Sequence, residues 1–367
     1  MVAAPQSRTP KGKGRASVRV FVSEFICGGA WNGSLPEPSL IREGAAMLAS
    51  VVGDFARAPG VRVCATWDGT RGVSPFGSDV EVLEVFSADE EAERFRQLVR
   101  ECDATLLIAP EFEGILAKRT AAVEAAGGHL LGSSSAAVAH CADKLRVAET
   151  LQAAGIPTIP AESSSFENES QAGFSFPWVI KPRDGAGSQS TFRVNDAAHW
   201  QQLLPDLLTA PLLRQAIRQP FVSGRPLSVG LILNDEGEIC DYLPPCDQLL
   251  SDDGRFRYLG GRVPAAGVPT ERIHEVAAAA CRLIPGLRGY IGIDLVLPEG
   301  ADTPVIVEIN PRLTTSWLGY SVLCQDNLAQ RVLSPGRSRR PLRWRSATID
   351  YVPQGPTLSP REGVSAR

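Results

Sequence analysis

The chain has 367 residues, of which 44% are hydrophobic and 21% are charged, with 37 basic and 41 acidic residues and a formal net charge of −4. This is the composition of a globular protein long enough for two or three domains, and it excludes intrinsic disorder, collagen and coiled coil. A mildly acidic chain also gives no overall electrostatic reason to expect nucleic-acid binding.

No stretch approaches the roughly 20 consecutive apolar residues that a transmembrane helix requires. Residues 1–17 form a polar, basic segment without a hydrophobic run, which we expect to be a disordered tail on a cytoplasmic protein. The eight cysteines are scattered without a C-x-x-C pair, and most lie in apolar runs. We therefore expect buried free thiols rather than disulfides or a zinc site.

Short β-rich runs alternate with amphipathic stretches of helical length over residues 18–132. We expect strands at 18–23, 61–66, 80–85, 104–109 and 129–131. Helices are expected at 39–56 and 89–100, and a further helix should end at residue 125. This alternation predicts an α/β, Rossmann-like domain with a parallel, doubly wound sheet. Its ligand crevice should lie at the carboxyl ends of the strands, where Glu24, Gly28, Gly29 and Glu111 fall.

The pattern changes after residue 132. Gly132-Ser-Ser-Ser supplies N-cap residues for helices that we expect to end near residue 154. Strands are expected at 177–182, 212–217, 227–234, 239–243, 290–297 and 305–309, and helices at 196–208 and 270–284. We infer a mainly antiparallel α+β domain over 133–333.

Residues 334–367 are rich in Arg, Pro and Gly. We expect a solvated C-terminal tail that docks at most one strand, at 347–352. An anionic partner for its arginines is the alternative.

Lys181 ends an apolar strand and is followed by a loop with two glycines and several hydroxyl side chains, Pro182-Arg-Asp-Gly-Ala-Gly-Ser-Gln-Ser. Backbone N–H groups of such a loop can approach phosphate oxygens, while the lysine supplies a compact cation. A glycine-rich hairpin turn has the same pattern. The sequence matches neither the P-loop nor the G-x-G-x-x-G pattern, so we do not expect those two kinds of phosphate site.

Three oxygen-bearing side chains interrupt two later apolar strands. Asp294 lies in one strand, and Glu308 and Asn310 flank Ile309 in the next, so these two share a face. Buried carboxylates that face each other repel unless a cation lies between them, and this set of oxygens suits Mg²⁺ or Mn²⁺. The alternative is an Asp or Glu that pairs with Arg312 or accepts hydrogen bonds from backbone donors.

Five motifs in this order resemble the ATP-grasp family over about residues 133–330: Ala142-Asp-Lys144, the run 179–188, Gln219-Pro-Phe-Val222, Gly292-Ile-Asp294 and Glu308-Ile-Asn-Pro-Arg312. The resemblance implies a pre-ATP-grasp α/β domain at 18–132, followed by an ATP-grasp fold at 133–333 with a small lid at about 156–217. The ATP-binding residues it implies are Lys144, Lys181, Gly185, Ala186, Gly187, Ser188, Gln219, Pro220, Phe221 and Val222. The implied metal ligands are Asp294, Glu308 and Asn310, and the implied catalytic residues are Lys181, Arg312 and Arg262.

Two positions depart from the family pattern. D-alanine ligases of the family carry a catalytic arginine where this chain has Gly292, so Arg312 or Arg262 would take that role. A hinge acid that bonds the ribose is replaced by Pro226. These departures keep open a nucleotide-binding regulator that has lost catalysis.

Further motifs, at residues 20–29, 109–113, 258–264 and 308–316, are similar to one branch of the family, the tyramine–glutamate ligases of methanofuran and methylofuran biosynthesis. The similarity implies an ATP-dependent ligase that forms an amide through an acyl phosphate, joining the γ-carboxylate of L-glutamate to a primary amine such as tyramine. Another amino-acid or peptide ligase of the family is the alternative. The candidate substrate contacts are Glu24, Gly28, Gly29, Glu111, Arg262 and Thr314. Thr314 and the two residues after it can also be explained as helix caps.

The partners we expect are therefore a small-molecule amine and an amino acid, without a membrane or nucleic acid, and a homodimer stays open. Lysine scarcity gives modest support to this site. The chain has five lysines, and two of the three outside the N-terminal tail, Lys144 and Lys181, fall at the expected phosphate-binding positions. A compact ammonium in a tight phosphate site is not readily exchanged for a planar guanidinium.

Overall fold

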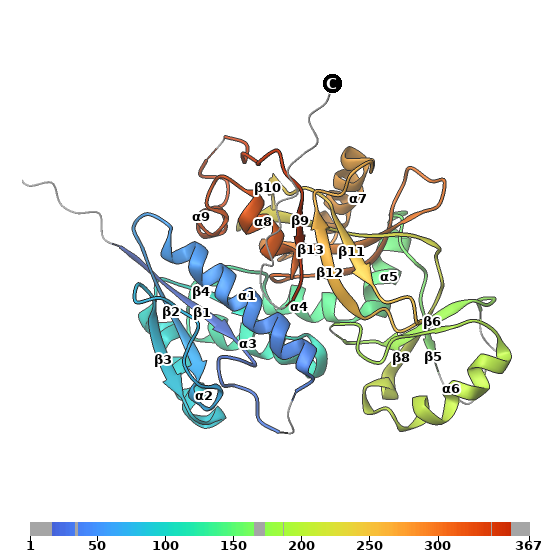
Figure 1. Cartoon of the computed structure of the whole chain (residues 1–367), viewed down its shortest axis with the longest axis horizontal. Helices are drawn as coiled ribbons and strands as arrows, with labels where there is room; N and C mark the ends of the chain where they lie inside the picture. The colour runs from blue at the N-terminus through green and yellow to red at the C-terminus, as the bar shows by residue number, and fades with distance from the viewer. Residues whose placement is uncertain (1–16, 34–35, 165–172, 186, 339, 354–367) are drawn as a thin grey trace, which may run out of the picture.

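The computed structural model describes residues 17–33, 36–164, 173–185, 187–338 and 340–353. Its first sheet is parallel, in the order β3-β2-β1-β4, as the alternating pattern predicted (Figure 1). Its strands are β1 (Val18–Glu24), β2 (Val61–Asp68), β3 (Glu81–Val85) and β4 (Ala104–Ile108). The strand expected at 129–131 is a single parallel bridge between Thr105 and Leu130.

Helices cover both faces of this sheet. They are α1 (Pro38–Ala56), α2 (Ala88–Glu101) and α3 (Ile115–Ala125), with short 3₁₀ turns η1 (Gly69–Arg71) and η2 (Phe112–Gly114). Alternate residues of each strand point to opposite faces. Val20 and Val22 pack with α1, whereas Phe21 packs with α2 and α3. The sheet is therefore the middle layer of three.

A seven-stranded antiparallel sheet forms the centre of the molecule, in the order β14-β13-β9-β11-β12-β15, with β10 paired to β9. Its strands are β9 (Gly224–Leu233), β10 (Ile239–Tyr242), β11 (Cys246–Leu250), β12 (Tyr258–Val263), β13 (Gly289–Pro298), β14 (Val305–Asn310) and β15 (Ile349–Tyr351). One face packs against α4 (Ser135–Ala142), α5 (Lys144–Ala153) and α7 (Thr270–Arg282). The other face packs against α8 (Ser316–Leu323), with α9 (Leu328–Leu333) nearby.

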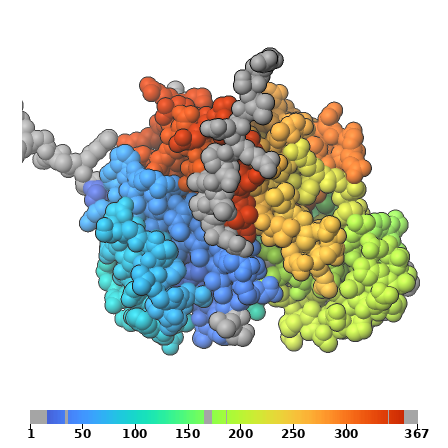
Figure 2. All heavy atoms as spheres, viewed as in Figure 1, coloured from blue at the N-terminus to red at the C-terminus, as the bar shows by residue number. Residues whose placement is uncertain are grey.

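A smaller antiparallel sheet carries its own core and lies beside the central sheet (Figures 1 and 2). It contains β5 (Glu162–Ser164), β6 (Trp178–Pro182), β7 (Phe192–Val194) and β8 (Ala216–Pro220), with α6 (Ala197–Thr209) and the turn η4 (Pro211–Gln215). The prediction of a strand from residue 212 was wrong up to residue 215. Pro211 begins a 3₁₀ turn that buries Leu213 in the core of this sheet.

Helix α1 joins the first sheet to the central region. Its residue Asp54 accepts hydrogen bonds from Trp317 Nε1 and Ser321 Oγ, both at 2.8 Å. The backbone oxygen of Asp54 accepts a bond from Asn327 Nδ2 at 2.7 Å. Because these partners belong to α8 and to the turn before α9, α1 is fixed relative to both sheets.

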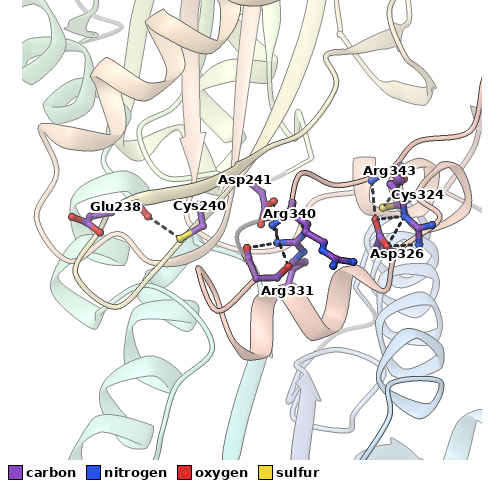
Figure 3. A network of polar contacts seen from close by, with 9 residues as sticks. Glu238, Cys240, Asp241, Cys324, Asp326, Arg331, Arg340 and Arg343 are labelled. Atoms are coloured by element: carbon purple, nitrogen blue, oxygen red, sulfur yellow. Dashed lines mark hydrogen bonds and ion pairs between the residues drawn. The ribbon is translucent and has the colours of Figure 1, made fainter.

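The segment after α9 folds back along the molecule instead of leaving it. Arg331 lies 3.6 Å from Asp241 and donates to backbone carbonyls beyond α9, and Arg343 forms an ion pair with Asp326 at 2.7 Å (Figure 3). The strand expected at 347–352 is present as β15, which pairs with β12. Residues 1–16 and 354–367, the outer parts of the two expected tails, lie outside the described residues.

All eight cysteines are free, and seven of them are buried, as predicted. The sulfurs of Cys64 and Cys102 lie 3.5 Å apart in the first domain. Within the described ranges, no helix is long and apolar enough to cross a membrane.

Candidate active site

A cavity of about 810 Å³ lies where the smaller antiparallel sheet (β5 to β8), the central sheet and α1 meet. The predicted site residues that line it are Lys144, Lys181, Gly185, Gly187, Ser188, Gln219, Pro220, Phe221, Val222, Asp294, Glu308, Asn310, Arg312 and Thr314. Most of the residues singled out by the motifs therefore share one space. Ala186 lies outside the described residues.

Two lysines reach this cavity from different elements. Lys181 is the last residue but one of β6 and is 7% exposed. Burial, helped by the neighbouring charge of Lys144 and opposed by Glu308, lowers the pKa of Lys181 to about 8. Lys144 begins α5, and its Nζ lies 2.7 Å from the oxygen of Gly185 and 3.4 Å from Glu308. The glycine loop and both ammonium groups are thus held together.

A second contact fixes the start of α5 to the strand that carries Lys181. Asp143, the N-cap of α5, accepts two bonds from Arg183, at 2.7 and 2.6 Å. The backbone N–H of Lys144 also donates to the oxygen of Arg183, at 3.0 Å. Because Arg183 lies two residues after Lys181, the two lysines keep their relative positions.

The two carboxylates are direct cross-strand neighbours. The antiparallel register of β13 and β14 pairs Asp294 with Glu308, and Asn310 Nδ2 lies 3.1 Å from Asp294 and 3.5 Å from Glu308. Burial and the charge of Glu308 raise the pKa of Asp294 well above its usual range. Although burial opposes it, the charges of Lys144 and Lys181 lower the pKa of Glu308 to about 2.

These oxygens fit a hard divalent cation. Two carboxylates and one amide converge at one place on the cavity wall, and oxygen ligands of this kind are those that such a cation takes. No group of three or more His, Cys, Asp or Glu side chains placed to hold a metal occurs among the described residues, so Asn310 would have to supply the third ligand. In the structure the side-chain nitrogen of Asn310 faces the two carboxylates, so its amide group would have to turn over to present the oxygen to a metal.

Among the described residues, Arg312 forms no ion pair with Asp294 or Glu308, contrary to the alternative considered from the sequence, although its charge lowers the pKa of both. It is buried, and two of its nitrogens lie 2.7 and 2.8 Å from the carboxylate of Glu111, in the loop after β4. Glu111 is 4% exposed and does not line the cavity. Glu111 therefore contacts Arg312 instead of the cavity, and this ion pair orients the guanidinium at the edge of the cavity.

The hinge segment forms the far wall. Gln219 Nε2 donates to the oxygen of Ile159 at 3.1 Å, which fixes the orientation of this buried amide. The ring of Phe221 lies 6.2 Å from that of Phe256 and 4.1 Å from the guanidinium of Arg193. Pro226 lines the cavity as well. The wall is largely flat and apolar, with one amide at its edge.

Thr314 explains why residue 292 is glycine. A Cβ atom at Gly292 would lie 2.4 Å from Cγ2 of Thr314, so an arginine does not fit there without displacing it. Oγ1 of Thr314 lies 2.9 Å from the hydroxyl of Tyr290. Thr315 occupies the N-cap position of α8, but its side chain makes no capping bond. The helix-cap explanation therefore does not hold for these threonines.

The remaining candidate substrate contacts do not line the cavity. Arg262 lies on β12 and forms an exposed ion pair with Asp350 at 2.6 Å. Glu24 is 2% exposed and accepts a bond from the backbone of Cys27. A Cβ atom at Gly28 would lie 2.2 Å from the oxygen of Glu24, and Gly29 has a φ of +93°. These residues shape the turn after β1.

Some cavity residues were not found from the sequence. Glu43 and Met47 of α1, Gln248 of β11 and Tyr258 of β12 all line it. Gln248 donates to Asp294 at 2.9 Å. The signal for Glu43 was an acid four residues before the buried Met47 on an amphipathic helix, so that the two share a face.

Comparison with known proteins agrees with this arrangement. Residues 141–316 match the model of the ATP-grasp domain, and residues 61–138 match that of the pre ATP-grasp 3 domain. Two similar curated proteins are the tyramine–L-glutamate ligases of Methanocaldococcus fervens, 29% identical, and Methanocaldococcus jannaschii, 26% identical. The matches cover 63% and 66% of this chain, respectively. They cover 65% and 66% of the two relatives, so the chain spans just under two thirds of the relatives' length.

A similar solved structure is N5-carboxyaminoimidazole synthetase from Staphylococcus aureus, complexed with ADP. The TM-score is 0.67 at 16% sequence identity, and the match covers 91% of this chain and 81% of that one. At this identity the similarity shows the fold alone.

Proposed function

Because this chain is a member of the ATP-grasp family, we propose that it is an ATP-dependent carboxylate–amine ligase. The proposed substrates are L-glutamate, through its γ-carboxylate, and a primary amine such as tyramine or another tyrosine-derived amine. The names of the two curated relatives support this pair of substrates, and the proposed setting is the biosynthesis of a methanofuran-type or methylofuran-type cofactor.

The proposal assigns the nucleotide to the space between the lid and the central sheet. Lys144 and Lys181 would neutralise its phosphates, and the loop that begins at Gly185 would cover them. The adenine would lie along residues 219–222, where the fixed nitrogen of Gln219 leaves the amide oxygen to accept a bond from the adenine amino group.

Asp294, Glu308 and Asn310 are the residues that would hold Mg²⁺, which when bound supplies positive charge beside the phosphate oxygens. In its absence the chain opposes these carboxylates with its own lysines, as the lowered pKa of Glu308 indicates. A buried Lys181 with a pKa near 8 keeps its proton at neutral pH in most molecules, so it stays a cation for phosphate binding.

The proposed chemistry needs positioning and charge more than proton transfer. The γ-carboxylate of glutamate attacks the γ-phosphorus of ATP, giving an acyl phosphate and ADP, and the amine then displaces phosphate from the acyl carbon. Arg312, which Glu111 holds at the edge of the cavity, would stabilise charge on the transferring phosphoryl group. Thr314, in the same cavity, is a candidate contact for the carboxylate substrate.

One observation carries the proposal: the two lysines, the carboxylate pair and Arg312 line one cavity with residues of α1, from the first domain. A second substrate can therefore meet the nucleotide there. The test is ADP release by the full chain with ATP, Mg²⁺, L-glutamate and a panel of amines and amino acids, with product masses measured. We expect release that depends on both substrates. ATP binding without release for any pair would favour a regulator over a ligase, and an amino-acid acceptor would indicate a peptide ligase.

A further inference from the structure

One carboxylate in the cavity has no partner in the part of the chain that the structure describes. Glu43 lines the cavity from α1, one helical turn before Met47. Its side chain forms no hydrogen bond or ion pair with any described residue, although it is largely shielded from water. A carboxylate in this position is costly unless something compensates its charge. Its presence at a cavity wall therefore points to a ligand.

The charges around Glu43 favour a cation. Burial raises the pKa of Glu43 to about 7, while the charges of Arg312 and Arg42 oppose that rise. Arg312, however, already makes two short contacts with Glu111, and Arg42 is exposed at the surface of α1. Arg312 thus has two carboxylates near it, Glu111 outside the cavity lining and Glu43 at the cavity wall, so a positively charged group beside Glu43 would complete the balance.

The neighbouring surface fits an ammonium group with an organic body. Tyr258 lines the same cavity, and its buried hydroxyl makes no direct hydrogen bond among the described residues, although the hydroxyls of Thr315 and Tyr351 lie near it. Met47 adds an apolar surface beside Glu43. A carboxylate, a hydroxyl and apolar carbon are what a primary ammonium on an alkyl or aralkyl chain requires, whereas an anion would be repelled.

We propose that Glu43 binds the primary ammonium group of a substrate, with the hydroxyl of Tyr258 as a second hydrogen-bond partner. The inference rests on the proposed ligase function and adds the residues that would recognise one of its substrates. Two sources have this chemistry, the acceptor amine and the α-ammonium group of glutamate. In either case the cation would lie in the same cavity as Arg312 and the carboxylate pair, so the group attached to it could reach the reacting atoms.

Binding calorimetry tests this without turnover. Tyramine and L-glutamate are titrated separately into the full chain with Mg²⁺ and a non-hydrolysable ATP analogue. The same titrations use Glu43→Gln, which removes the charge but keeps the shape. Loss of a charge-assisted hydrogen bond should weaken one of the two ligands about 10- to 100-fold. Weaker tyramine binding assigns the site to the acceptor amine, and weaker glutamate binding assigns it to the amino acid.

Glu37→Gln is the matched control, because Glu37 precedes the same helix, is exposed and makes no side-chain capping bond. It should change neither affinity. Glu43→Asp keeps the charge and should lose less affinity than Glu43→Gln. Equal affinities of the parent and Glu43→Gln for both ligands, or no binding of either ligand to the parent, would overturn the proposal.

Turnover is measured separately, so that the two proposals fail in different ways. A parent that binds an ammonium ligand through Glu43 but releases no ADP with any substrate pair keeps the binding site and loses the ligase function. A parent that turns over, while Glu43→Gln binds both ligands as tightly, keeps the ligase function and loses the binding site.

Discussion

Asp294→Asn should make the protein more stable and the enzyme inactive. Asp294 faces Glu308 directly across two antiparallel strands, and like charges in that position repel. Asparagine has nearly the same shape and can still accept the hydrogen bond from Gln248, but it carries no charge. Without metal and nucleotide, the substitution therefore removes the repulsion and loses one hydrogen bond, the one that Asn310 Nδ2 donates to the second oxygen of Asp294.

The structure sets the size of the effect. The amide nitrogen of Asn310 lies 3.1 Å from an oxygen of Asp294 and 3.5 Å from an oxygen of Glu308, so these two oxygens are within about 6.6 Å of each other. Two unit charges about 6 Å apart repel by roughly 3 kcal/mol at an effective dielectric constant of about 20. Lys144, 3.4 Å from Glu308, offsets part of this. We expect a net gain of about 1–2 kcal/mol in the free energy of unfolding.

The measurement is urea unfolding of the parent and the variant in a chelating buffer, followed by turnover with Mg²⁺. A gain of this size would raise the melting temperature by only about 1–3 °C for a chain of this length, so the denaturant midpoint is the better readout. Asp252→Asn is the control, because Asp252 is an exposed aspartate that lines the same cavity, and it should leave stability unchanged. A variant less stable than the parent, or one that keeps full Mg²⁺-dependent turnover, would refute the reasoning.

Three further predictions concern single side chains. Lys181→Arg should lower kcat/KM for ATP at least about tenfold, because a planar guanidinium does not fit a site in which the compact ammonium is only 7% exposed. The control Lys118→Arg should leave kcat/KM unchanged. Full turnover by Lys181→Arg would contradict the inference from lysine scarcity. Glu111→Gln should cost about 3–5 kcal/mol in urea unfolding, since it leaves the buried charge of Arg312 unpaired, and a loss below about 1 kcal/mol would show that the pair is not needed. Arg262→Ala should change kcat/KM less than about twofold and the free energy of unfolding by no more than about 1 kcal/mol, since the ion pair of Arg262 with Asp350 is exposed. A large loss of activity would show that Arg262 is a catalytic residue after all.

Local patterns were sufficient for most elements and for the core of the candidate site. Strand periodicity placed Asp294, Glu308 and Asn310 on strands, and the register of β13 and β14 then brought them together. The position of Lys181 at the end of β6 was likewise visible as an apolar run that ends in lysine. The strand expected at 212–217 failed in part because the burial of Leu213 in a 3₁₀ turn gives the same apolar pattern.

Contacts between distant segments were decided by the tertiary structure alone. Arg312 meets Glu111 across 201 residues, and Arg262 meets Asp350 across 88, so no periodicity could tell which arginine reaches the cavity. Glu43 joined the cavity because α1 packs against α8 and α9 through Asp54, which is a matter of how layers dock. The sequence by itself supplied the candidates for phosphate and metal binding, since each of those motifs spans only a few consecutive residues. Only the folded chain decided which charges are already paired and which, among the described residues, have no partner, because pairing depends on distances between elements that the sequence does not encode locally.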